Sequence, residues 1–340
     1  MKPEHLQILR SPESKKSLQC KQPVFVDGRI RSGVLTDGEY SYPIIDYIPR
    51  FVPYDNYCSS FTLEWEKHPD ILYGKYSNYS AYEERFHKET RWEGDLRGEV
   101  ILEAGCGPGA FTRYALETGA TVVSFDASRG VEKSHEMNGK NDNCCILQAS
   151  IYEMPFPDNF FDRIFCFGVL QHTPDPRGSL RALVSKLKPG GQLACDIYSV
   201  PPSHHPYTGL LKTKYFLRRF TRGKEPNKLY RLISHYVGVM WPITRVMRRI
   251  PKYGIQINRK FLFDDYDTRL TNMDRKLHKE FARLDIFDML SPAYDLPSTV
   301  EELGKWYQLA GLDSVEVHFG YNGIEGRGRK PIHHDGGGHQ

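Results

Sequence analysis

The sequence predicts an α/β protein built on a doubly wound, mostly parallel sheet. Between residues 99 and 200, short apolar runs alternate with amphipathic segments, which is the pattern of successive β-α-β units. The first run, Val100–Leu102, continues into three glycines at alternate positions and then into a segment with helical spacing. A strand, a glycine turn and a helix in this order begin many ligand-binding α/β sheets. A chain of 340 residues can bury one such core together with a small module.

Five strands are expected in this core, because each is a short apolar run of the kind that a parallel sheet buries on both faces. They span residues 99–104, 121–126, 144–149, 162–167 and 191–198. Between the last two, four apolar residues recur with the spacing of an amphipathic helix. These are Leu180, Leu183, Val184 and Leu187, and Pro189, Gly190 and Gly191 are expected to end the helix.

Residues 1–53 precede the core and form a short, strand-rich stretch. Asp-Gly pairs at residues 27–28 and 37–38 are typical of tight turns between antiparallel strands. We therefore expect a small N-terminal β-rich module.

Residues 54–98 are rich in Tyr, Trp and Glu and are predicted to form a cap segment. A helix over residues 80–92 would place Tyr82 and Phe86 on one face. This aromatic face either packs on the sheet or forms a flap that contacts the substrate, and both interpretations are kept.

Residues 201–290 interrupt the sheet pattern and are predicted to form a helical lid insertion. Between residues 201 and 260 there are 14 Lys or Arg residues and a single acid, Glu225, although the net charge of the whole chain is only +4. Such a segment is either a solvated helical surface or a basic amphipathic surface that meets an anion. The candidate partners are an acidic acceptor, an anionic membrane surface and nucleic acid, of which nucleic acid is the least favoured.

The sheet pattern resumes at residues 291–330, which are expected to complete the core. Ser298 to Glu301 has the spacing of a capping box, so a helix should begin there and end at Gly311. An alternating strand over residues 315–319 and an Asn-Gly turn then predict a final strand pair. Residues 331–340 are expected to be a flexible tail, whose glycines give its histidines no fixed metal geometry.

Composition narrows the class of protein further. The first residues lack the apolar core of a signal peptide, and no apolar run reaches the roughly 20 residues of a membrane span. The seven cysteines show no framework spacing, which is typical of reduced thiols. We therefore expect a cytoplasmic protein.

The glycine turn alone does not identify its ligand. Gly105, Gly107 and Ala110 also fit the dinucleotide pattern G-x-G-x-x-G/A, and Asp126 ends the next strand, where a carboxylate binds ribose hydroxyls. That geometry suits any adenosine ligand. Glu103 favours a positively charged ligand, because an acid facing the mouth of the turn would oppose a pyrophosphate.

Five motifs occur in order over about 100 residues. Together they resemble the motifs of Rossmann-like, class I S-adenosylmethionine-dependent methyltransferases, and this resemblance is more specific than that of the glycine turn alone. They are Leu102–Gly109, Phe125–Ser128, Met154–Asp162, Gly168–Pro176 and Leu187–Gly191. The chain looks most similar to the small-molecule group related to quinone biosynthesis. The resemblance implies a seven-stranded sheet that ends in an antiparallel strand pair, with S-adenosyl-L-methionine as the cofactor.

The N-terminal module resembles the zinc-ribbon-like segment that precedes some bacterial methyltransferase domains. In that segment the first pair of ligands is usually cysteine, whereas this chain has Ser11 and Ser14, and only Cys20 remains nearby. Serine is a poor zinc ligand, so we expect a degenerate, metal-free module with a packing role.

The resemblance assigns roles to residues of the core. Gly105, Gly107 and Gly109 would lie against the methionine and ribose portions of the cofactor, and Glu103 would lie near its ammonium group or order water around it. Asp126 would accept hydrogen bonds from both ribose hydroxyls, beside Ala127.

Further roles follow for residues after the third and fourth strands. Ser150 stands where the family usually has an Asp that holds the adenine amino group, and Ile151 would offer its N–H to adenine. Gly168 would lie near the transfer point. His172 is the first candidate for a general base, or else packs only against protein. Tyr294 is a weaker candidate for acceptor contact.

Four functions therefore remain open. The leading one is methyl transfer to an O, N or C atom of a small acceptor. An NAD-dependent oxidoreductase would share the turn and Asp126, and a nucleic-acid methyltransferase would use the basic insertion. A non-catalytic cofactor-binding protein is consistent with Ser150 and with the absent zinc ligands.

Overall fold

The computed structural model describes residues 1–53, 56–68, 79–200, 208–269 and 275–332. The chain forms two compact units. The first consists of Met1–Asn56, Asn78–Ser199 and Leu296–Gln340, and the second consists of Tyr57–Ser77 and Val200–Asp295. Residues 57–68, which the sequence places in the cap, thus group with the helices of the insertion. Most of the predicted flexible tail lies outside the described residues.

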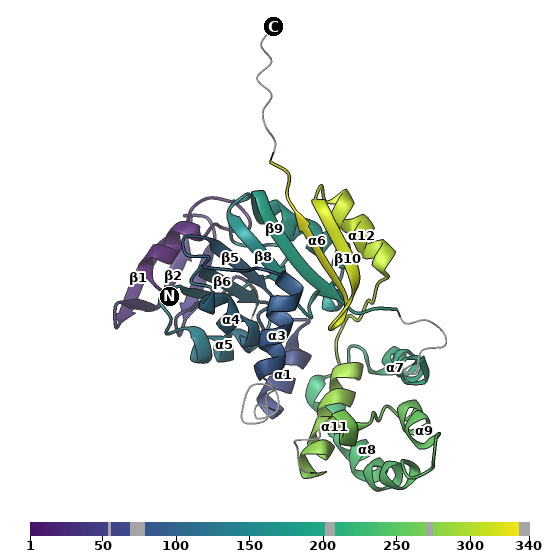
Figure 1. Ribbon diagram of the computed structural model, residues 1–340. Coiled ribbons are helices and arrows are strands. Elements are labelled where there is room, and N and C mark those ends of the chain that lie inside the picture. Colours follow the sequence, from purple (N-terminus) through teal and green to yellow (C-terminus); the bar gives the residue numbers. More distant parts are fainter. Residues whose placement is uncertain (54–55, 69–78, 201–207, 270–274, 333–340) are drawn as a thin grey trace. The chain divides into compact units, whose positions relative to one another are not determined.

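A seven-stranded sheet forms the centre of the first unit, with the strand order β10-β11-β9-β8-β5-β6-β7 (Figure 1). Strands β5 to β9 pair in parallel, whereas β11 is antiparallel to both β9 and β10. The strands are β5 (Val100–Ala104), β6 (Thr121–Asp126), β7 (Cys144–Gln148), β8 (Phe161–Cys166), β9 (Leu187–Ile197), β10 (Asp313–Gly320) and β11 (Gly323–Arg329). The predicted doubly wound sheet with its C-terminal antiparallel pair is confirmed.

Helices cover both faces of this sheet, because successive strand residues point to opposite sides. Ile101 and its same-face neighbours pack against α3 and α4, whereas Leu102 and its neighbours pack against α6 and α12. Helix α5 packs on the α4 side through Val131. The helices are α3 (Tyr79–Thr90), α4 (Ala110–Glu117), α5 (Gly130–Asn138), α6 (Pro176–Lys186) and α12 (Val300–Leu309).

Two predicted element boundaries are wrong. Helix α6 ends at Lys186, and Pro189–Gly191 lies inside β9, because Leu187 already pairs with Phe161 of β8. The capping box of α12 is formed one residue later than expected, by Thr299 and Glu302.

The shift of the capping box has a local cause. The Ser298 N–H donates to the Tyr198 carbonyl at 2.8 Å, within a bridge that continues the strand direction past β9. The helix therefore starts only at the next residue, where the Glu302 N–H donates to the Thr299 hydroxyl at 3.1 Å.

The N-terminal module is a four-stranded antiparallel sheet preceded by the short 3-10 helix η1 (Pro3–Ile8). Its strands are β1 (Gln19–Val26), β2 (Arg29–Thr36), β3 (Ser41–Ile45) and β4 (Ile48–Pro49). Hydrogen bonds hold the turn that carries the two serines. The Ser11 hydroxyl lies 3.0 Å from the Tyr42 hydroxyl, and the Ser14 hydroxyl donates to Asp37. The likeness to a zinc ribbon stays a prediction.

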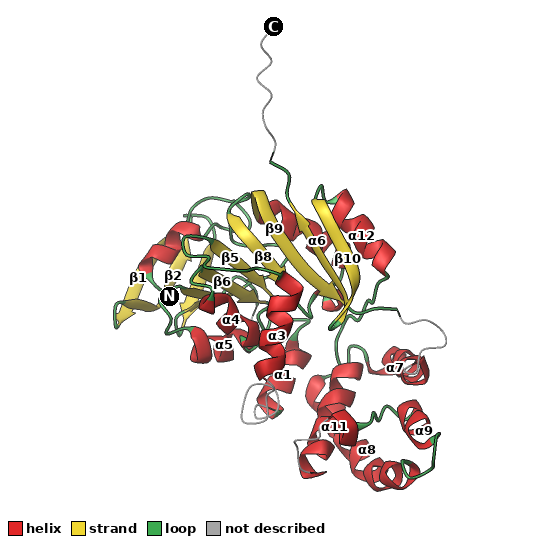
Figure 2. Cartoon of the chain, viewed as in Figure 1, coloured by secondary structure: helices red, strands yellow, loops and turns green. Residues whose placement is uncertain are grey.

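The described part of the second unit contains helices and no strand (Figure 2). Its core joins Leu63 of α1, Ile233 of α8 and Phe287 of α11. The helices are α1 (Ser59–Lys67), α7 (Thr208–Thr221), α8 (Pro226–Met247), α9 (Gly254–Lys260), α10 (Tyr266–Arg269) and α11 (Arg275–Leu290). Nowhere in the described chain is a helix both long and apolar enough for a transmembrane span.

Candidate cofactor site

The candidate site lies at the carboxyl ends of the parallel strands, where the strand order reverses between β5 and β8. The turn after β5 contains Gly105, Gly107 and Gly109, with φ angles of 81°, 50° and 87°. This left-handed region favours glycine. A Cβ atom at Gly105 would also lie only 2.3 Å from a methyl group of Val169. Backbone conformation and packing therefore both require glycine in this turn.

The N–H groups of the turn are used within the protein. Those of Gly105 and Cys106 donate to the Phe125 carbonyl at 2.7 and 2.9 Å, and that of Gly107 donates to Asp126 Oδ2 at 2.9 Å. In a dinucleotide site, such groups and the following helix face the pyrophosphate. These three donors are already paired, which disfavours a diphosphate at this turn.

Glu103 is more deeply buried than its position in the sequence suggests. The residue is 2% exposed rather than open at the mouth of the turn, and its Oε2 accepts hydrogen bonds from the hydroxyls of Thr112 and Ser124. These bonds join β5 to α4 and β6. Burial raises the pKa of the Glu103 carboxyl to about 7.

Asp126 ends β6, and its carboxylate is held in place from two sides. Besides the Gly107 N–H, it accepts the Ser128 N–H at 2.7 Å and the Ser128 hydroxyl through Oδ1. A carboxylate has about four acceptor positions and three are used here, so Asp126 keeps one for a ribose hydroxyl, and a second hydroxyl would take the position that the Ser128 hydroxyl now occupies. Its orientation is thus fixed without a ligand.

The segment after Asp126 is supported by residues that sequence reasoning missed. The Ala127 carbonyl accepts hydrogen bonds from Gln148 Nε2 at 2.9 Å and from Asn56 Nδ2 at 2.6 Å. Arg50, which is 8% exposed, donates to Gln148 Oε1 at 3.0 Å and to Glu132 Oε1 at 3.2 Å. The N-terminal module thereby braces the candidate site, and no local sequence pattern signals contacts over such separations.

The residues predicted to hold adenine follow β7. Ser150 is half-buried, and its hydroxyl oxygen accepts the Tyr152 N–H at 3.2 Å. The hydroxyl hydrogen and one lone pair therefore stay available. Ile151 is buried in the core.

Gly168, after β8, is anchored by a buried ion pair. With a φ of 73°, it donates its N–H to Asp196 Oδ1 at 2.5 Å. Asp196 is fully buried and pairs with Arg85 of α3, which also donates to Glu89 Oε1 at 2.5 Å. Burial and the nearby Asp196 raise the pKa of Glu89 to about 8. Helix α3 is therefore fixed at the end of β8 by charge as well as by packing.

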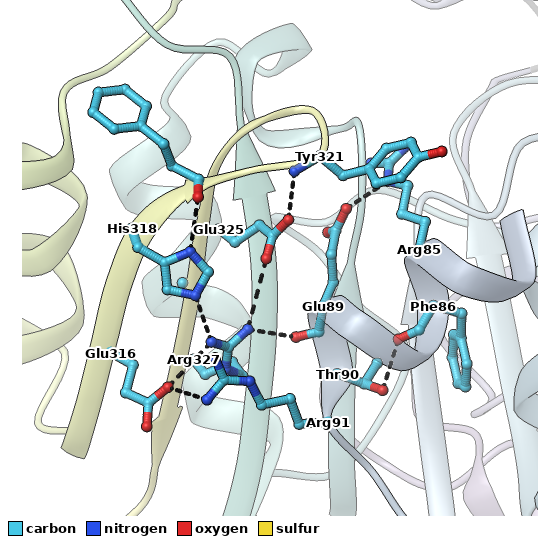
Figure 3. A network of polar contacts seen from close by, with 12 residues as sticks. Arg85, Phe86, Glu89, Thr90, Arg91, Glu316, His318, Tyr321, Glu325 and Arg327 are labelled. Carbon is cyan, nitrogen blue, oxygen red and sulfur yellow. Dashed lines mark hydrogen bonds and ion pairs between the residues drawn. The ribbon is translucent and has the colours of Figure 1, made fainter. Parts of the chain in front are cut away.

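Figure 3 shows how this network continues onto the β10–β11 hairpin. Arg327 donates to the Glu89 carbonyl at 3.1 Å and to Glu316 Oε2 at 3.1 Å, and Arg91 reaches the same Glu316 oxygen at 2.8 Å. The Tyr321 N–H donates to Glu325 Oε1. The hairpin thus helps to hold α3 in position.

His172 lies on the short 3-10 helix η2 (Leu170–His172) and is 9% exposed. Its ring meets that of Tyr198 edge-on, with centroids 5.4 Å apart. The neighbouring Gln171 is fully buried. His172 therefore lies at the same edge of the sheet as the glycine turn. Its role as a general base and its role in packing against protein both stay predictions.

The aromatic candidates lie in different surroundings. Tyr82 is half-buried and meets Phe111 edge-on at 5.3 Å. Phe86 has no exposed surface and packs against Trp92 and Phe165, which favours the interpretation as a packed cap. Tyr294 belongs to the second unit.

The sheet order and the site together define a Rossmann-like α/β fold with the antiparallel pair of class I methyltransferases. Residues 102–195 match the family model described as a methyltransferase domain. Over residues 102–195, the chain is therefore similar to methyltransferase domains.

Similar proteins cover only parts of the chain. An uncharacterized protein from Synechococcus sp. is 38% identical over 105 residues, which cover 29% of this chain and 25% of that protein. A ubiquinone biosynthesis O-methyltransferase from Pseudomonas entomophila is 29% identical over 141 residues, covering 40% of this chain and 59% of the enzyme.

Sequence identity to solved structures is also low. A putative S-adenosyl-L-methionine-dependent methyltransferase from Methanococcus maripaludis has 15% identity and a TM-score of 0.42, with coverage of 82% of this chain and 95% of that chain. Among the curated relatives named above, the chain spans 25% and 59% of their lengths.

Because Glu103 is buried, we expect the free energy of unfolding to depend on pH. Its pKa is about 7 in the folded protein and about 4.5 in the unfolded chain, so stability falls as the pH rises between these values. Glu103→Gln keeps an oxygen acceptor and removes the charge. We expect it to raise the free energy of unfolding by about 2 kcal/mol at pH 8 and to change it little near pH 4.5. Urea unfolding at both pH values measures this, and a variant less stable than wild type at pH 8 would contradict it.

The Arg85 ion pairs predict a second stability effect. Arg85→Met leaves Glu89 and Asp196 buried without their cation, so we expect the free energy of unfolding to fall by about 3 kcal/mol at pH 8. The loss should shrink at pH 5, where the Glu89 carboxyl, whose pKa is raised to about 8, takes up a proton. Arg113→Met, which breaks an exposed pair with Glu117, is the control and should cost under about 1 kcal/mol. Equal losses in the two variants would show that the network does not stabilise α3.

Proposed function

We propose that the protein is an S-adenosylmethionine-dependent methyltransferase that methylates an O, N or C atom of a small acceptor, acidic or lipid-linked. The observation that carries this proposal is the pairing of the glycine turn with Asp126. The turn uses its own N–H groups internally, while Asp126 places a carboxylate beside it. This chemistry suits a cationic ligand with a ribose better than a diphosphate.

The residues present fit that cofactor. Asp126 would accept hydrogen bonds from the ribose hydroxyls beside Ala127, and Ser150 with the Ile151 N–H would meet adenine. Glu103 would stabilise the ammonium group of the methionine portion, at the cost of keeping a carboxyl of raised pKa buried.

The glycines have a separate role in the proposal. Gly105, Gly107 and Gly109 would allow close approach of the cofactor, because each lacks a side chain where the backbone turns in the left-handed region. Gly168 would lie at the transfer point, held there by Asp196.

When bound, the cofactor supplies a methyl group on a positively charged sulfur, so its leaving group is already activated. The work left to the chain is to align the acceptor and to exclude water. For an O or N acceptor, His172 would take the acceptor proton as general base. Tyr82 is the proposed acceptor contact of the first unit, whereas the buried Phe86 is proposed to position α3.

The remaining functions differ in what they bind. An NAD-dependent oxidoreductase requires donors for a diphosphate, which the paired N–H groups of the turn do not favour. A nucleic-acid methyltransferase predicts RNA or DNA binding that falls steeply with salt. A non-catalytic protein would bind the cofactor without turnover, and release of S-adenosylhomocysteine with any acceptor would exclude it.

Asp126 gives the most specific test of cofactor binding. We expect Asp126→Asn to weaken S-adenosylhomocysteine binding at least tenfold in calorimetric titrations, because an amide accepts hydrogen bonds from ribose hydroxyls less strongly than a carboxylate does. Glu301→Gln, at an exposed carboxylate on α12, should leave the affinity unchanged. Unchanged binding in Asp126→Asn, or stabilisation by NADH in place of S-adenosylhomocysteine, would contradict the proposal.

A general base at His172 predicts a kinetic signature. With an O or N acceptor identified by S-adenosylhomocysteine release, we expect His172→Gln to lower kcat roughly 100-fold or more and to remove the acidic limb of the pH–rate profile. The affinity for S-adenosylhomocysteine should not change. A variant with wild-type kcat would assign His172 to packing against Tyr198.

A further inference from the structure

The second unit presents an exposed face on α7 that combines aromatic and basic side chains. Lys212, Phe216, Arg219 and Phe220 are all exposed and follow one another at the spacing of a single helical face. Phe216 and Phe220 are 57% and 62% exposed, and their rings meet edge-on with centroids 5.6 Å apart. Two adjacent phenylalanines open to solvent are unusual, because aromatic side chains normally bury their large apolar area.

Helix α8 carries a similar face along its length. The side that includes Leu229, Ile233 and Val237 is buried in the helical core. The opposite side is basic near its start and apolar further on. Its exposed residues are Lys228, Arg231, Leu232, His235, Val239, Ile243 and Val246.

The cations of this unit fall into two groups. One group pairs with carboxylates, as Lys214 does with Asp295 and Arg248 does with Asp265. The second group is exposed and makes no ion pair with a carboxylate in the described residues. Its members on α7, at the start of α8 and between these two helices are Lys212, Arg219, Arg222, Lys224, Lys228 and Arg231. The single acid between residues 201 and 260, Glu225, accepts the N–H groups of Asn227 and Lys228 as the cap of α8.

We propose that these two exposed faces, one on α7 and one on α8, dock onto an anionic lipid bilayer. Phe216, Phe220 and the aliphatic residues of α8 would enter the boundary between headgroups and acyl chains, and the unpaired cations would contact the lipid phosphates. Interfacial amphipathic helices combine these two features in the same way.

Charge and apolar area together favour a bilayer over other occupants. A second copy of the chain would bring six unpaired cations against six others, which opposes association. Nucleic acid would account for the cations, but it would leave Val239, Ile243 and Val246 without an apolar partner. The inference does not depend on methyl transfer, although a bilayer would also be the place to meet a lipid-linked acceptor.

Vesicle flotation of the full chain without cofactor tests the proposal. We expect the protein to float with vesicles that contain phosphatidylglycerol, to stay behind with pure phosphatidylcholine, and to bind less as salt increases. The variant with Lys228→Gln and Arg231→Gln should lose about fivefold in partition coefficient for each charge removed. The variant with Phe216→Ser and Phe220→Ser should lose binding at every salt concentration.

Matched variants in the first unit serve as controls. Val24→Ser with Phe25→Ser removes two apolar side chains that are each 53% exposed on β1, and Lys21→Gln with Lys140→Gln removes two exposed charges. Both should bind vesicles like the wild type, and circular dichroism checks that all variants fold.

Three results would overturn the proposal. The first is no flotation with anionic vesicles at low salt, or equal losses in the control variants. The second is salt-dependent binding to RNA without binding to vesicles, which would assign the two faces to nucleic acid. The third is self-association, seen by sedimentation, that the Phe216→Ser and Phe220→Ser variant abolishes.

Discussion

The hydrogen bond from the Gly107 N–H to the Asp126 carboxylate is the constraint on which the site depends, because it joins the turn after β5 to the end of β6. The turn can form only with glycines in the left-handed region, and it places the N–H groups of Gly105 and Cys106 on the Phe125 carbonyl. As a result, Asp126 is oriented before any ligand binds. Preorganised acceptors of this kind bind without the cost of ordering a loop.

Buried charge is the second theme of the first unit, and it is concentrated at the same end of the sheet. Glu103 lies beside the turn, and the Arg85 ion pairs connect α3 to Gly168. Buried ionisable groups reduce stability unless they are paired, so their presence near a ligand site is typical of function. The N-terminal module adds support from the other side, where Arg50 and Gln148 hold the segment after Asp126.

The sequence predicted those features that depend on local pattern. Apolar runs located the parallel strands, and the glycine turn and Asp126 were found from their spacing. The capping box was misplaced by one residue, because the bridge that holds Ser298 comes from a distant strand. The burial of Glu103 and the Arg50–Gln148 contact were also missed, because both depend on residues that only the folded chain brings together. Phe86 could not be assigned from spacing, since a helical aromatic face looks alike whether it packs or binds.

A structure of the protein with bound S-adenosylhomocysteine tests the central claim most directly. We predict that the ribose hydroxyls bond to the Asp126 carboxylate, with the Ser128 hydroxyl giving up its position to one of them, while the Gly105 and Cys106 N–H groups stay on the Phe125 carbonyl. A ribose bound away from Asp126, or a turn that opens to direct these N–H groups at the ligand, would contradict it.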